Sequence, residues 1–138
     1  MKIKLIVFIT VFCIIPVLYS AEDVVIIVNQ SVNETTLSKK DVSNIFLGKK
    51  TSWSDGSNIK YVVRTGDIHT SFIKSYLGKK ESQFKTYWKK QVFTGKGSPP
   101  KELNSDQAMV DFVAQTAGAI GYVSAGIDVS KVKTITIN

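Results

Sequence analysis

A change of hydrophobic period within residues 59–77 constrains the fold of this chain more than any other feature. Residues 59–63 are rich in β-branched and aromatic side chains, which favour a strand. From residue 68 to residue 77 the apolar side chains instead recur every three or four positions, which indicates an amphipathic helix. Between the two segments lies Gly66, which allows a tight turn. The sequence therefore predicts a strand that leads directly into a helix, with Arg64 where the strand ends.

The junction between this strand and this helix is a candidate anion-binding site. The first turn of a helix presents N–H groups without intrahelical partners and a partial positive charge. Arg64 adds a planar fork of donors suited to phosphate or carboxylate. Hydroxyl hydrogen bonds can come from Thr65, Thr70 and Ser71. The alternative is that Arg64 is an ordinary surface arginine, and that Thr65 or Asp67 serves only as a helix cap.

The first 21 residues are predicted to be a secretory signal peptide. A basic start is followed by the apolar run 5–18 and by small residues, and cleavage is expected after Ser20 or Ala21. The alternative is an uncleaved membrane anchor, although the run is short for a span. Cys13 is the only cysteine and lies in this run, so residues 22–138 are predicted to form one domain without a disulfide or a cysteine metal site.

Composition narrows the classes of partner. The formal charge is +7, and the lysines occur in scattered pairs, which favours anionic partners through long-range attraction. No nucleic-acid-binding motif is recognisable, so nucleic acid is not an expected partner. No nucleophile elbow or metal-ligand spacing is present either, and the carboxylates Asp55 and Asp106 are interpreted as structural. We therefore expect neither catalysis, nor a metal, nor a cofactor.

The remaining segments predict an alternation of strands and helices. Residues 23–29 form a continuous apolar run typical of a central strand, and a buried aromatic anchor is expected at Trp53. Further predicted elements are a helix from Ser38 to Gly48, a helix over 83–92 capped by Ser82, a helix capped by Asn104 or Ser105, a buried strand over 119–123 and an edge strand near 129–137. This order predicts a three-layer α/β domain, with a sheet between helices.

Several short motifs occur in one order along the chain and resemble those of the phosphate-binding proteins of ABC importers, within the type II periplasmic binding protein superfamily. The motifs are Ile45–Lys49 with Trp53, Val63-Arg64, Phe93–Gly97, and Gly118–Val123. The resemblance implies a mixed central sheet flanked by helices. A full member of this family has two lobes that close on the ligand, whereas this chain is long enough for one and resembles the second, inserted lobe.

The resemblance also implies a ligand set at the predicted junction. The family has an Arg, then an Asp, then Ser-Gly-Thr before the helix. This chain keeps Arg64 and Thr70, but it has Ile68 in place of the Ser and His69 in place of the Gly. The predicted anion-binding residues are Arg64, Thr65, Asp67, His69, Thr70, Ser71 and Ser38. The resemblance supports Arg64 and Thr70, and Ser38 is included because ligands in open α/β sheets lie beyond the carboxyl ends of strands. A protonated His69 would strengthen anion binding below about pH 6.5, although an exposed histidine without a role is an equal alternative.

Two hypotheses for function follow from the residues and the resemblance. The first is an exported solute-binding module that takes phosphate or a similar oxyanion and serves an ABC permease. The second is a periplasmic interaction module that kept the fold, lost transport, and binds another periplasmic protein or a membrane sensor. A half-cleft leaves an anion facing water, where Coulomb attraction is weak, so a second lobe or a homodimer would be needed for tight binding.

Overall fold

The computed structural model describes residues 23–138, and the predicted signal peptide with Cys13 lies outside the described residues. Its main sheet has the strand order β4-β3-β5-β1-β6. The strands are β1 (Val24–Val28), β3 (Lys60–Arg64), β4 (Lys101–Leu103), β5 (Ala119–Ser124) and β6 (Lys133–Thr134). Strand β3 is parallel to β4 and β5, whereas β1 is antiparallel to β5 and β6. The mixed sheet expected from the sequence is confirmed.

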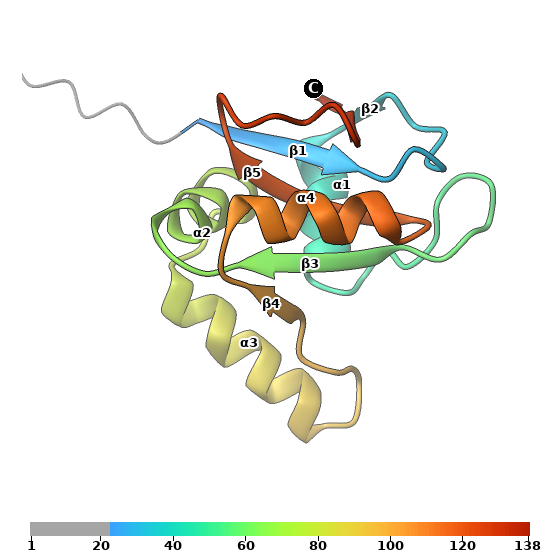
Figure 1. The fold of residues 1–138 in the computed structure, drawn as a ribbon. Coiled ribbons are helices and arrows are strands. Elements are labelled where there is room, and N and C mark those ends of the chain that lie inside the picture. Colours follow the sequence, from blue (N-terminus) through green and yellow to red (C-terminus); the bar gives the residue numbers. More distant parts are fainter. Residues whose placement is uncertain (1–22) are drawn as a thin grey trace, which may run out of the picture.

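Helices cover both faces of this sheet (Figure 1). Helix α4 (Asp106–Gln115) packs on one face, where Met109 and Val113 contact residues such as Ile27 and Val62. Helix α1 (Lys39–Phe46) and helix α2 (Asp67–Phe72) pack on the other face. Helix α2 continues without interruption into a π-helical turn (Ile73–Leu77). The predicted three-layer architecture is therefore confirmed.

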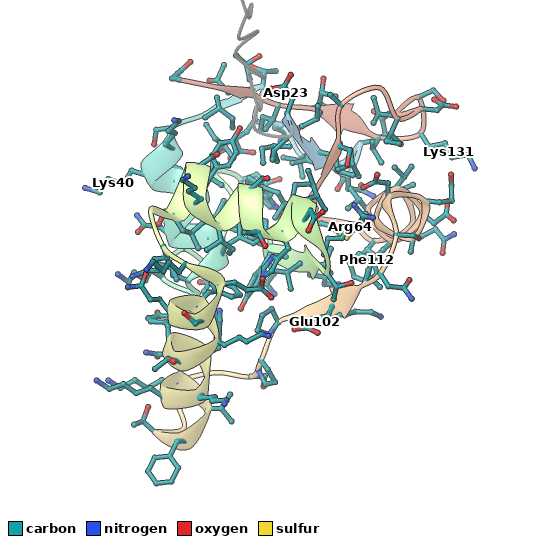
Figure 2. The ribbon with its side chains drawn as sticks, turned by 90° about the vertical axis from the view of Figure 1, so that its left-hand side faces the viewer. Asp23, Lys40, Arg64, Glu102, Phe112 and Lys131 are labelled. Atoms are coloured by element: carbon teal, nitrogen blue, oxygen red, sulfur yellow. The ribbon has the colours of Figure 1, made fainter. Side chains whose placement is uncertain are left out.

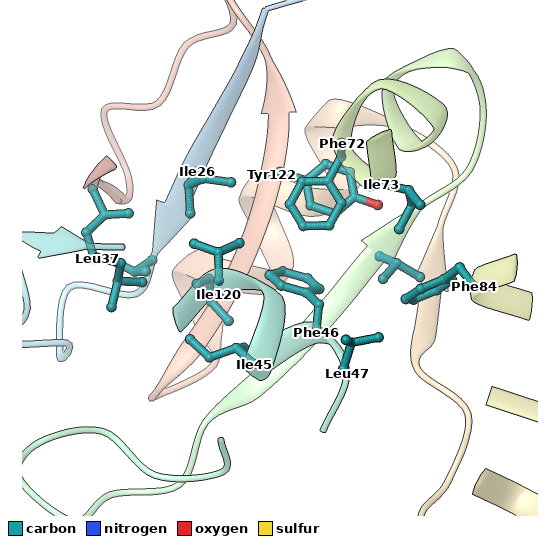
Figure 3. Packing of buried hydrophobic residues seen from close by; sticks show 14 of the residues in the cluster. Ile26, Leu37, Ile45, Phe46, Leu47, Phe72, Ile73, Phe84, Ile120 and Tyr122 are labelled. Carbon is teal, nitrogen blue, oxygen red and sulfur yellow. The ribbon is translucent and has the colours of Figure 1, made fainter. Parts of the chain in front are cut away.

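The larger core lies between the sheet and the α1–α2 layer (Figure 3). Tyr122 of β5 is fully buried and stacks on Phe72 with ring centroids 3.8 Å apart. Phe46 of α1 meets both rings edge-on. Trp53 is buried as predicted, and its indole N–H donates to the carbonyl of Gly118 at 2.9 Å. These aromatic contacts fix α2 against the sheet, directly after the strand that carries Arg64.

Helix α3 (Glu81–Phe93) projects beyond the sheet next to β4 (Figure 1). Only its Phe84 and Trp88 are buried, in the larger core. At its carboxyl end two apolar side chains lie in solvent, since Val92 is 44% exposed and Phe93 is 92% exposed. The helix begins earlier than predicted, because Lys80 rather than Ser82 is its N-cap and the Lys80 N–H donates to the Gln83 side chain.

Two of the predicted helix caps are confirmed by the structure, and one is not. Ser38 and Ser105 cap α1 and α4 as expected, and Ser38 forms a reciprocal capping box with Asp41. The predicted cap of α2 was wrong, because Gly66 occupies that position with a φ of +94° that favours glycine. The predicted single edge strand near the C-terminus is two strands. Strand β6 pairs with β1, and β7 (Thr136–Ile137) pairs with β2 (Thr36–Leu37) in a separate sheet.

Candidate anion-binding site

Arg64 ends β3 and its guanidinium is already paired. Its Nη1 lies 2.8 Å from Oδ1 of Asp106, and the two side chains are 19% and 16% exposed. Asp106 is the first residue of α4, where a carboxylate is stabilised by the helix dipole, and its Oδ1 also accepts from the Ser124 N–H at 3.4 Å. Figure 2 shows Arg64 beside helix α4, which carries Asp106. A carboxylate that was interpreted as purely structural therefore holds the predicted anion-binding arginine.

The pairing leaves Arg64 with part of its donor set. A guanidinium has five N–H donors in a fixed plane, and Asp106 engages Nη1. The Nε of Arg64 is buried and has no hydrogen-bond partner. The side chain is 19% exposed, and the N–H groups that Asp106 does not engage are the donors left for an oxyanion. Asp106 fixes the orientation of this fork, but its negative charge also opposes a second anion beside it.

The first turn of α2 does not leave all of its N–H groups free for a ligand. The N–H groups of His69 and Thr70 donate to the carbonyl of Gly66, at 3.0 and 3.4 Å. Ile68 is 2% exposed, and its side chain belongs to the core. The positions available to a ligand at this turn are therefore the backbone N–H groups of Asp67 and Ile68.

His69 lies inside the molecule rather than at the anion site. It is 6% exposed, and its Nδ1 is 2.6 Å from the hydroxyl of Tyr122. The same hydroxyl accepts from the backbone N–H of Arg64 at 2.9 Å. Burial lowers the pKa of His69, and the nearby carboxylates Glu81 and Glu102 only partly oppose this effect. Burial therefore disfavours a charged His69, and its Nδ1 is engaged by Tyr122 rather than by an anion. The alternative of an exposed histidine is wrong, since the ring is buried.

The remaining predicted site residues are only partly brought together. Thr65 and Thr70 are exposed and Ser71 is half-buried, all close to Arg64 in the chain. The Thr70 hydroxyl, however, donates to the carboxylate of Glu81 at 3.1 Å. Ser38 is elsewhere: its hydroxyl accepts from the Asp41 N–H, and its neighbour Lys39 lies over the Tyr76 ring, at the far end of the α2 segment. Ser38 is therefore a cap rather than part of this group.

Two of the donors predicted to bind an anion are therefore paired with carboxylates of the protein itself. Arg64 is paired with Asp106, and Thr70 donates to Glu81. Sequence reasoning missed both contacts, and it also missed Tyr122 as the group that joins His69 to β3. The only signal for Asp106 was its place directly after the capping Ser105. Within residues 23–138, no group of three or more His, Cys, Asp or Glu side chains could hold a metal ion.

The geometry defines a class of protein, a single α/β lobe with an oriented arginine where a strand passes into a helix. A family model described as a PBP superfamily domain matches residues 10–137, and the chain belongs to this family. Its fold is that of one lobe of a type II periplasmic binding protein. No curated protein matches the chain. Among the described residues, no helix is long and apolar enough to cross a membrane.

Solved structures with the same fold include receptors for phosphate. An ABC-type phosphate transport receptor from Vibrio cholerae is 22% identical with a TM-score of 0.62, covering 84% of this chain and 46% of the receptor. PstS from Borrelia burgdorferi is 14% identical with a TM-score of 0.67, covering 85% of this chain and 47% of PstS. A phosphate binding protein from Stenotrophomonas maltophilia is 19% identical with a TM-score of 0.56, covering 84% and 39%. The chain therefore spans less than half the length of these proteins.

Proposed function

We propose that this chain is an exported, single-lobe solute-binding module that binds phosphate or a similar oxyanion and serves an ABC importer. The observation that carries the proposal is the guanidinium of Arg64, held by Asp106 where β3 passes into α2, in a fold shared with phosphate receptors. Its role is binding rather than catalysis. An oxyanion would accept from the N–H groups of Arg64 that Asp106 does not engage and from the backbone N–H groups of Asp67 and Ile68.

Asp106 determines how strongly this site attracts an anion. Its carboxylate orients the guanidinium, but it also places a negative charge within a few ångströms of the incoming ligand. An asparagine at this position keeps one acceptor oxygen for Arg64 and removes the charge. We therefore expect the affinity for phosphate to rise when Asp106 is replaced by Asn and to fall when Arg64 is replaced by Gln.

Calorimetric titration with phosphate tests both expectations on the chain without its predicted signal peptide. Asp106→Asn is expected to bind phosphate about three- to tenfold more tightly than the wild type, which corresponds to roughly 1 kcal/mol. Arg64→Gln is expected to abolish the heat of binding, and Lys131→Gln, an exposed lysine in the turn before β6, is the matched control. Absence of binding by both the wild type and Asp106→Asn at millimolar phosphate would refute the proposal.

A second candidate function is an interaction module that binds a periplasmic protein or a membrane sensor. The occupation of Arg64 by Asp106 and of Thr70 by Glu81 favours it, because a lobe that no longer binds phosphate has no need of free donors there. Affinity capture from periplasm, with and without phosphate, separates the two functions. A partner retained equally by wild type and Arg64→Gln supports the interaction module, whereas retention that requires phosphate and Arg64 supports the solute-binding module.

A further inference from the structure

The carboxyl end of helix α3 carries apolar side chains that the core of this lobe does not cover. Among the described residues, Val92 and Phe93 are the only large hydrophobic side chains that are exposed, at 44% and 92%. Every residue from 92 to 99 is exposed. Figure 1 shows α3 reaching away from the sheet, with its carboxyl end farthest from it. This projecting end, residues 89–99, is the α3 tip, and its exposed apolar side chains make it a candidate interaction surface.

The α3 tip is also basic. Residues 82–101 contain five lysines and no acidic residue. The acidic residues that flank this segment are Glu81, which already pairs with Lys85 at 3.5 Å, and Glu102 in β4. Within residues 23–138, none of the lysines of the tip takes part in an ion pair. They are Lys89, Lys90 and Lys96. Their charge attracts an anionic partner and repels a second copy of the chain, whose tip has the same charge.

The backbone at the end of α3 is hydrogen-bonded within the tip itself. The carbonyls of Lys90, Gln91 and Val92 accept from the backbone N–H groups of residues 94–96, at 2.9 to 3.1 Å. The Thr94 hydroxyl also donates to the Lys90 carbonyl, at 2.8 Å. Unpaired carbonyls at a helix end resist transfer out of water, because a lipid environment offers them no donor. These three carbonyls have partners already, so the tip can leave water without losing their hydrogen bonds.

The dimensions of the tip fit a lipid surface better than a folded protein. One exposed phenylalanine offers about 200 Å² of apolar surface, whereas a stable protein interface buries about 800 Å² on each partner. Lys89 and Lys90 precede Phe93 by four and three residues, which is about 4–6 Å along a helix. Apolar side chains of interfacial helices lie about 5–10 Å into the boundary between headgroups and acyl chains. With the Phe93 ring at that depth, the two lysines are level with the headgroups.

We propose that the α3 tip binds the surface of an anionic phospholipid bilayer. Val92 and Phe93 enter the boundary between headgroups and acyl chains, and the lysines of the tip contact lipid phosphates. One aromatic ring and three lysines give reversible binding that requires both the apolar and the ionic contribution. The surface uses none of the residues proposed to bind phosphate, so this proposal does not depend on the proposed function.

Flotation with lipid vesicles tests the proposal on the chain without its predicted signal peptide. The vesicles contain phosphatidylcholine with about 30% phosphatidylglycerol, or phosphatidylcholine alone. We expect the anionic vesicles to bind the chain at least about tenfold more tightly, and sodium chloride to weaken this binding. Sodium phosphate is expected to weaken it no more than sodium chloride of the same ionic strength, because a bilayer rather than a single phosphate is recognised.

Variants assign the binding to the α3 tip. Phe93→Ser is expected to weaken binding at least about tenfold, and its thermal unfolding should be unchanged because the ring is 92% exposed. Lys89→Gln combined with Lys90→Gln is expected to weaken binding about five- to thirtyfold. Lys39→Gln combined with Lys40→Gln, an exposed lysine pair on α1, removes the same charge and is expected to have a much smaller effect.

A spin label measures the depth of the tip directly. Without the predicted signal peptide the chain has no cysteine, so Thr94→Cys provides a single labelling site next to Phe93. On anionic vesicles the label is expected to become more accessible to oxygen and less accessible to a water-soluble relaxing agent. Ser130→Cys, in the turn before β6, is the control and should not change.

Several outcomes would overturn the proposal. They are absence of binding to anionic vesicles at low salt, equal binding to neutral vesicles, binding that Phe93→Ser leaves unchanged, and release by phosphate beyond its ionic strength. Self-association of the chain, detected by light scattering and abolished by Phe93→Ser, would assign the tip to a second copy and would overturn it as well.

Discussion

At the scale of single residues, His69 gives the folded protein a pH dependence just below neutrality. Its pKa in the folded protein is below the ordinary value of 6.5, mainly because the ring is buried. The surrounding charges are Glu81 and Lys85 on α3 and Glu102 on β4, and Tyr122 contacts the ring from β5. The unfolded chain therefore binds the proton more readily than the native one as pH falls below 6.5.

We predict that stability is at its full value above pH 6.5 and is lost as the pH falls towards the lowered pKa of folded His69. Thermal unfolding of the wild type between pH 8 and pH 5 measures the loss. His69→Phe removes the titrating group, so its stability, although lower overall, is expected to vary less over this interval. An identical pH dependence in the two proteins would assign the effect to the surface carboxylates instead.

A second residue-scale prediction concerns Gly118, which lies between Asn58 and Trp53. A Cβ at this position would come 2.3 Å from the carbonyl oxygen of Asn58, and the φ of +75° is itself unfavourable for alanine. Gly118→Ala is expected to cost about 3 kcal/mol or more, the sum of backbone strain and overpacking. Gly126 has a similar φ of +85° with nothing within 4 Å of its Cβ position, so Gly126→Ala is expected to cost only about 1–2 kcal/mol. Equal values in chemical denaturation would show that the backbone at residue 118 can move away.

At the scale of elements, the start of α1 distinguishes a structural serine from a ligand-binding one. The hydroxyl of Ser38 accepts from the Asp41 N–H at 3.0 Å and closes a capping box. Ser38→Ala is therefore expected to destabilise the protein by about 1 kcal/mol and to leave phosphate affinity unchanged. Ser43→Ala, in the interior of the same helix, is the control and should change stability by only a few tenths of a kcal/mol. Loss of phosphate binding in Ser38→Ala would return this residue to the anion site.

The structure also shows which features of the fold can be predicted from the sequence. The passage from β3 into α2 and the caps at Ser38 and Ser105 were predictable, because each depends on side chains within a few positions of one another. The contacts that decide the character of the site are not local. Asp106 reaches Arg64 from another helix, and Tyr122 reaches His69 across 53 positions. Periodicity and capping signals carry no information about such pairs, so an arginine that looked free is paired and a histidine that looked exposed is buried.

At the scale of the whole molecule, the site proposed for phosphate lies in a single lobe. The chain spans 46% of the Vibrio cholerae receptor, and the Arg64 side chain is 19% exposed in this lobe. An anion bound there is surrounded by water on one side, where its attraction to the guanidinium is weaker than in an enclosed site and is screened by salt. The formal charge of +7 includes Lys2 and Lys4 of the predicted signal peptide, so the chain without it carries +5, which adds a long-range attraction that salt also removes.

We therefore predict that phosphate affinity depends strongly on ionic strength. Raising the ionic strength from about 0.01 M to 0.1 M shortens the screening length from about 30 Å to about 10 Å, and affinity is expected to fall about three- to tenfold. Titrations in sodium chloride measure the effect, and sucrose serves as an uncharged control. Lys131→Gln removes one remote charge and should retain nearly the same salt dependence, since the local pair of Arg64 and ligand dominates. An affinity that does not change with salt would mean that the ligand is enclosed, as in a site completed by a second copy of the chain or by another protein.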